Sequence, residues 1–167
     1  MKTHTGKIVE TKTLSIRQII VALDLNRRCE ATLGYAAKIA SYCYAVLYVT
    51  YVFWPPRMSE GPYYYLIDKA QRGYAHKLNQ MVSFAAKTAP RSRPALLVGE
   101  PAKRIAALAR DVHADLIITS NYKPIFPTQL FDISDSINIV HEAACPVLIY
   151  DEVDVLQGAG GPLQCRY

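Results

Sequence analysis

The sequence lacks an apolar run long enough to cross a membrane, and it lacks closely paired cysteines. Its longest apolar stretch, Tyr44 to Trp54, falls far short of the roughly 20 residues that a membrane-spanning helix needs. No apolar signal segment stands at the N-terminus. The four cysteines never have C-x-x-C spacing, which disfavours a zinc or thioredoxin-like site and favours packed free thiols. We therefore expect a cytoplasmic protein that does not contact membranes.

Long runs of like charge and known catalytic motifs are also missing. The net charge is +5 and the isoelectric point about 9.0, but the lysines and arginines are scattered along the chain. We therefore expect a solvated basic surface and consider a nucleic-acid partner unlikely. No G-x-S-x-G or P-loop occurs, and the four histidines are dispersed instead of being spaced for a metal. The sequence thus predicts no catalytic residues, no metal site and no enzyme.

The residues that are present indicate an alternation of strands and helices in one globular domain. The chain has 167 residues, 51% of them apolar, which suits a single domain with a sizeable core. Continuous apolar runs mark strands that are buried on both faces, and stripes at helical spacing mark the helices between them. The predicted strands are 17–25, 45–53, 95–98, 115–119 and 146–150, and the predicted helices are 29–43, 63–88, 102–112 and 134–143.

This alternation predicts an α/β fold with right-handed crossovers and an open parallel sheet that has helices on both faces. Such folds bind their ligands at the carboxyl ends of the strands. We expect an N-terminal extension over 1–14, one domain over 15–150 and a flexible C-terminal tail over 151–167, where glycines and a proline gather.

Three segments carry a resemblance to a known family. They are IIVALDLN at 19–26, LLVGEPAKRIAALARDVHADLIITS at 96–120 and HEAACPVLIY at 141–150. In their order and spacing they resemble the universal stress protein family over about residues 15–150. The resemblance implies a Rossmann-like sheet of five strands. It also implies a homodimer that forms through the last strand, made of Val147, Leu148, Ile149 and Tyr150. The alternative is that the tail after Tyr150 covers this edge within one chain.

Many members of the family bind ATP through a loop with three glycines, the last followed by Ser or Thr. Glycines let backbone N–H groups approach phosphates closely. Counted back from the last strand, the three glycine positions hold Ser120, Lys123 and Ile133, and Ser134 alone keeps the expected residue type. A tightly held triphosphate is therefore not expected. The hydroxyl of Ser134 is better explained as a helix cap.

Two further positions match the family's adenine site. Asp24 stands where the resemblance places an acidic residue that contacts adenine, and Val52 where a backbone contact is made. Asp24 could instead cap the first helix, and Val52 could be ordinary core. The candidate residues of a degenerate nucleotide site are Asp24, Val52, Ser120, Lys123 and Ser134.

Three functions remain open on this basis. The leading hypothesis is a non-enzymatic stress-response protein that acts as a homodimer through protein contacts or through sensing a small ligand. The second is a switch that binds AMP or ATP. The third, an electron-transfer flavoprotein or another adenine-binding relative, is weaker because the chain is short and has no flavin-type loop.

Overall fold

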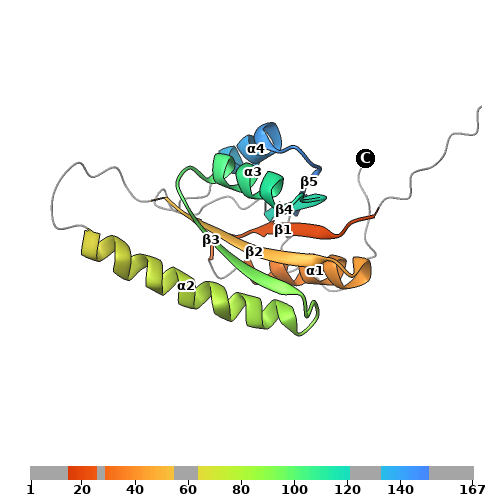
Figure 1. Ribbon diagram of the computed structural model, residues 1–167, viewed down its shortest axis with the longest axis horizontal. Helices are drawn as coiled ribbons and strands as arrows, with labels where there is room; N and C mark the ends of the chain where they lie inside the picture. The colour runs from red at the N-terminus through yellow and green to blue at the C-terminus, as the bar shows by residue number, and fades with distance from the viewer. Residues whose placement is uncertain (1–14, 26–28, 55–63, 121–132, 151–167) are drawn as a thin grey trace, which may run out of the picture.

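The computed structural model describes residues 15–25, 29–54, 64–120 and 133–150, apart from the side chains of 64–67 and 133–135. The expected extension over 1–14 and the expected tail over 151–167 lie outside the described residues. Five parallel strands form one sheet in the order β3-β2-β1-β4-β5, with helices on both faces (Figure 1). The elements are β1 Gln18–Ala22, α1 Cys29–Cys43, β2 Val46–Phe53, α2 Tyr64–Ala86, β3 Ser92–Val98, α3 Pro101–Asp111, β4 Leu116–Ser120, α4 Ile133–Glu142 and β5 Val147–Tyr150. The predicted α/β class and sheet type are confirmed.

The strand β1 lies at the centre of the sheet and pairs with both neighbours. Its residues Ile19, Ile20 and Val21 are fully buried. Ile20 lies in register with Tyr48 of β2 on one side and with Ile117 of β4 on the other. A parallel strand that is covered on both faces has apolar residues at successive positions, which is why this segment shows no alternation with polar residues.

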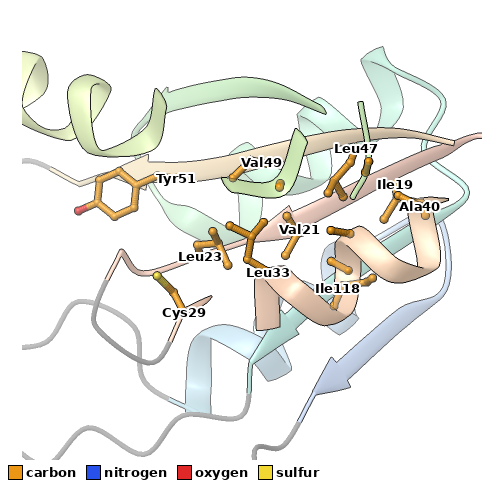
Figure 2. Packing of buried hydrophobic residues seen from close by; sticks show 14 of the residues in the cluster. Ile19, Val21, Leu23, Cys29, Leu33, Ala40, Leu47, Val49, Tyr51 and Ile118 are labelled. Carbon is orange, nitrogen blue, oxygen red and sulfur yellow. The ribbon is translucent and has the colours of Figure 1, made fainter. Parts of the chain in front are cut away.

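The core is divided by the sheet into two clusters. One contains Val21 and Leu23 from the sheet together with Leu33 of α1 and Leu78 of α2. Figure 2 shows Leu33 and Ala40 of α1 pointing at the strands, with the side chain of Ile118 among them. The second cluster lies on the opposite face, where α3 and α4 cover Ile20, Val52 and Ile117. Among the described helices, none is both long and apolar enough to span a bilayer.

The element bounds follow the sequence closely, with one clear error. The helix predicted at 29–43 is confirmed as α1. The sequence predicts the third strand only from residue 95, but β3 begins at Ser92 and includes Pro94. β3 is an edge strand that pairs with β2 alone. An edge strand has N–H groups that face away from its neighbour, so a proline is tolerated there.

Two helices end with a bulky residue where a glycine is usual. After α1, Tyr44 has φ of 53°. Its N–H donates to Ser41 O at 3.2 Å, and the N–H of Ala45 donates to Ala40 O at 2.9 Å. These two bonds form a Schellman motif, whose left-handed residue is most often glycine. His113, with φ of 51°, takes the same place after α3. A side chain in this conformation costs about 1 kcal/mol.

The start of β1 is joined to the start of β4 by one carboxylate. Asp115 Oδ2 accepts hydrogen bonds from the backbone N–H of Arg17 at 2.7 Å and of Gln18 at 3.0 Å. The N–H of Asp115 in turn donates to Gln18 O at 2.8 Å. This reciprocal pairing extends the ladder between the central strands to the amino end of the sheet.

Truncating Leu33 to alanine tests the contribution of the α1 core. Because Leu33 is fully buried, we expect Leu33→Ala to lower the free energy of unfolding by about 2–5 kcal/mol in urea titrations. The matched control is Lys38→Ala on the exposed side of the same helix, which should change it by less than about 0.5 kcal/mol. Equal effects of the two variants would contradict this packing.

Removing the carboxylate of Asp115 tests the junction between β1 and β4. Asp115→Ala leaves two backbone N–H groups without their acceptor, so we expect a loss of about 1–3 kcal/mol in the free energy of unfolding. Asp111→Ala, an exposed aspartate at the end of α3, is the control and should be near neutral. Amide exchange of Arg17 and Gln18 should accelerate in Asp115→Ala only.

Candidate functional site

The strand order places a switch point between β1 and β4. Crossovers that leave these two neighbouring strands pack on opposite faces of the sheet, and ligands in such folds bind at the carboxyl ends beside that point. The last registered pair of β1 with β2 is Ala22 with Thr50, so β2 continues for three residues past it, to Phe53. The backbone of Val52 therefore lies beyond the β1–β2 ladder, in a step of the sheet edge.

Three of the predicted site residues gather at this edge. Asp24 follows β1 and is half-buried, Val52 is near the end of β2, and Ser120 is the last residue of β4. The side chain of Val52 is 1% exposed and packs on the α3 and α4 side of the sheet. Its backbone, but not its side chain, is thus placed for a ligand. Ser134 lies in the first turn of α4, with its side chain outside the described residues. Lys123 lies outside them as well.

A serine that the sequence analysis did not select links α4 to the end of β4. The hydroxyl of Ser136 donates to Ser120 O at 2.9 Å, and Ser136 is 4% exposed. This bond holds the first turns of α4 against the carboxyl end of β4. The carbonyl of Ser120 is therefore already engaged by the protein.

Asp24 stands in a group of polar residues on the α1 and α2 side of the sheet edge. Burial raises the pKa of the Cys29 thiol to about 11, with the charge of Asp24 adding to the rise and Lys77 opposing it. The ammonium group of Lys77 donates to Leu25 O, so α2 holds the turn that follows β1. Leu25 has φ of 56°, a left-handed conformation that this bond helps to maintain. Cys29 is therefore a neutral thiol in a site that holds charges of both signs.

Aromatic side chains line the α2 side of the same edge. The rings of Tyr51 and Tyr74 have centroids 4.7 Å apart, and those of Phe53 and Tyr74 are 5.4 Å apart. Burial raises the pKa of Tyr51. The adjacent Tyr74, through its charge and its hydrogen bond, raises this pKa further, and so does the charge of Asp24. In Figure 2 the ring of Tyr51 lies at the carboxyl end of β2, on the same end of the sheet as Cys29. The edge thus has an aromatic wall beside an acidic group.

The sequence analysis missed Lys77, Tyr74 and Ser136. The partners of Lys77 and Ser136 are backbone carbonyls, which have no residue-type signal in a sequence. Tyr74 falls within the helix predicted at 63–88, where helical spacing alone does not distinguish it from ordinary core. Ser136 lies two residues after Ser134, in the first turn of α4. Its hydroxyl near a helix start was the only feature of the sequence that could have indicated its role.

The residues present do not suit a triphosphate cradle. Two of the three positions that hold glycine in the family's loop are described here, Ser120 at the end of β4 and Ile133 as the first residue of α4. Each has a Cβ where the family's loop lets backbone approach a phosphate. The third, Lys123, lies outside the described residues.

A hollow of about 460 Å³ lies at the opposite end of the sheet, between the ends of α3 and α4. Its lining includes Arg110, His113 and Cys145. Burial and the charge of Asp115 raise the pKa of the Cys145 thiol. This hollow contains none of the predicted site residues, so it is separate from the carboxyl edge. In the part of the chain that the structure describes, no three or more His, Cys, Asp and Glu side chains are grouped to hold a metal ion.

Comparisons with known proteins agree with this architecture. The family model of the universal stress protein family matches residues 15–151. No curated protein matches the chain. Among solved structures, universal stress protein UspA from Lactobacillus plantarum has a TM-score of 0.69 at 23% identity, covering 80% of this chain and 97% of its own.

Two further structures of similar fold contain nucleotides. A universal stress protein in complex with cAMP has a TM-score of 0.64 at 20% identity, covering 81% of this chain and 97% of that one. The universal stress protein from Archaeoglobus fulgidus in complex with dAMP has a TM-score of 0.57 at 23% identity, covering 81% and 98%. At these identities the likeness concerns the fold, whereas the family model covers most of the sequence. The chain therefore belongs to the universal stress protein family.

Proposed function

We propose that the protein is a non-enzymatic, cytoplasmic stress-response protein that binds a small adenine-containing ligand and acts as a homodimer. The observation that carries the ligand proposal is the step in the sheet edge at Val52, flanked by the half-buried carboxylate of Asp24. A base can hydrogen-bond to exposed strand backbone there, while the carboxylate accepts from an amino or hydroxyl group.

The ligand is a nucleoside monophosphate and not a triphosphate under this proposal. Neither Ser120 nor Ile133 is a glycine, so neither offers the bare backbone that a phosphate cradle needs. The solved structures of similar fold that hold cAMP and dAMP, each with a single phosphate, support a ligand of this size. A switch driven by ATP is the second candidate, and it requires that residues 121–132 supply the missing phosphate contacts.

The dimer proposal rests on a contrast between the two edges of the sheet. Edge β3 carries Arg93 and Pro94, both of which hinder pairing with another strand. Edge β5 has the sequence VLIY, with neither charge nor proline. Ile149 on β5 is 42% exposed, and Ile137 and Val140 on the adjacent α4 are 49% and 45% exposed. An apolar patch beside an edge strand that has neither charge nor proline favours pairing of β5 with its copy.

Calorimetry with AMP and ATP tests the ligand. We expect AMP to bind more tightly than ATP, and Asp24→Asn to weaken AMP binding about tenfold because a charged acceptor is lost. Asp111→Asn at the far end of the sheet is the matched control and should leave binding unchanged. Submicromolar binding of ATP would favour the ATP-driven switch instead, and equal AMP affinity in both variants would remove Asp24 from the site.

Light scattering tests the dimer. We expect a dimer at micromolar concentration, and a monomer for Ile149→Lys, because a charged side chain on β5 opposes strand pairing. Val98→Lys changes a similarly exposed residue on the other edge and should remain dimeric. A monomeric mass for the unmodified protein at micromolar concentration would refute the dimer.

A further inference from the structure

Large side chains lie on the outer face of α1. Tyr35, Lys38 and Tyr42 follow one another at spacings of three and four residues, opposite the buried stripe of Leu33, Ala36, Ala37 and Ala40. Tyr42 is 87% exposed and Tyr35 is 38% exposed. The ring of Tyr35 is stacked on Tyr150 of β5 at a centroid distance of 4.8 Å. The outer face thus presents two rings with an ammonium group between them.

Tyr44, the residue that follows α1, adds a third ring, and Arg91 beside it adds a second cation. Tyr44 is 85% exposed, and Arg91 Nη1 donates to Tyr44 O at 3.2 Å. Arg91 precedes β3, so the fold brings a cation that is distant in the chain to the end of α1. We call Tyr35, Lys38, Tyr42, Tyr44 and Arg91 the tyrosine surface.

Packing accounts for Tyr35, which stacks on Tyr150, but not for Tyr42 and Tyr44. The rings of Tyr42 and Tyr44 stand almost wholly in solvent, so they contribute little to the core. Tyr44 also holds a left-handed backbone position that glycine would hold without strain. Backbone strain at a residue whose side chain is not packed against the core is typical of residues that serve a function.

We propose that the tyrosine surface binds single-stranded nucleic acid. Exposed rings stack on bases of any sequence, and interspersed cations neutralise phosphates. The net charge of +5 attracts a polyanion over longer distances. An acidic peptide fits less well, because three rings accompany two cations and carboxylates have no flat faces to stack. The scattered order of the cations along the chain pointed to a solvated surface, whereas the contact of Arg91 with the end of α1 is a property of the fold.

The test is fluorescence anisotropy of a labelled 20-nucleotide oligo(U), with a duplex of the same length as comparison. We expect the single strand to bind more tightly than the duplex and affinity to fall with salt. Tyr42→Ala should weaken binding of the single strand about tenfold, whereas Tyr42→Phe, which keeps the ring, should retain it. Lys38→Ala should reduce the slope of log affinity against log salt by about 0.7, and Lys103→Ala, an exposed lysine on α3, should not.

The two Schellman positions provide a control that separates stability from binding. Tyr44→Gly and His113→Gly each relieve a left-handed side chain, so both should raise the midpoint of thermal unfolding. Only Tyr44→Gly should weaken oligo(U) binding. Asp24→Asn should leave this binding unchanged, so the result is independent of the nucleotide site.

Three outcomes would overturn the proposal. They are an absence of oligo(U) binding at 100 µM protein and low salt, equal affinities of Tyr42→Ala and the unmodified protein, and displacement of oligo(U) by a poly-glutamate peptide at equal charge concentration. The last result would assign the surface to an acidic protein partner.

Discussion

The pairing of β1 with a strand on each side is the constraint on which the rest of the molecule depends. Its buried residues supply both core clusters, since Val21 faces α1 and α2 while Ile20 faces α3 and α4. At its amino end the backbone is tied to β4 through Asp115. Beyond its carboxyl end the chain turns at Leu25, whose carbonyl accepts a hydrogen bond from Lys77. The position of Asp24 follows directly from these contacts, because it lies between the buried strand and the fixed turn.

Much of the fold could be predicted because burial leaves a pattern in residue type. The stripe of Leu33, Ala36 and Ala40 gave the bounds of α1, and continuous apolar runs gave four of the strands. The start of β3 was mispredicted because a proline reads as a break unless the strand is known to lie at an edge. Edge and centre are properties of strand order, which nothing within the segment 92–98 encodes. The left-handed ends at Tyr44 and His113 were missed for a related reason, because no glycine marks them.

The candidate site was only partly predictable. Asp24 and Val52 came from a resemblance, and the structure places both at the carboxyl edge where the strand order puts a ligand. Lys77 and Ser136 act on backbone carbonyls, so their roles depend on where two distant segments meet. The aromatic wall of Tyr51, Phe53 and Tyr74 appeared in the sequence only as core. A periodic pattern reports that a side chain faces inward, but it does not report which end of the sheet it borders.

The helix α1 presents one large side chain, Leu33, and several alanines to the sheet, while Tyr35 and Tyr42 lie on its outer face. Alanines at 36, 37 and 40 let the helix axis approach the sheet closely, so little volume is needed to fill the space between them. The free energy of unfolding therefore depends little on the exposed residues at positions 38 and 42. Substitutions there can accumulate without unfolding the protein, and the outer face of α1 can acquire or lose a partner while the carboxyl edge of the sheet stays unchanged. The residues on the outer face of this helix can therefore change independently of the residues that pack beneath it.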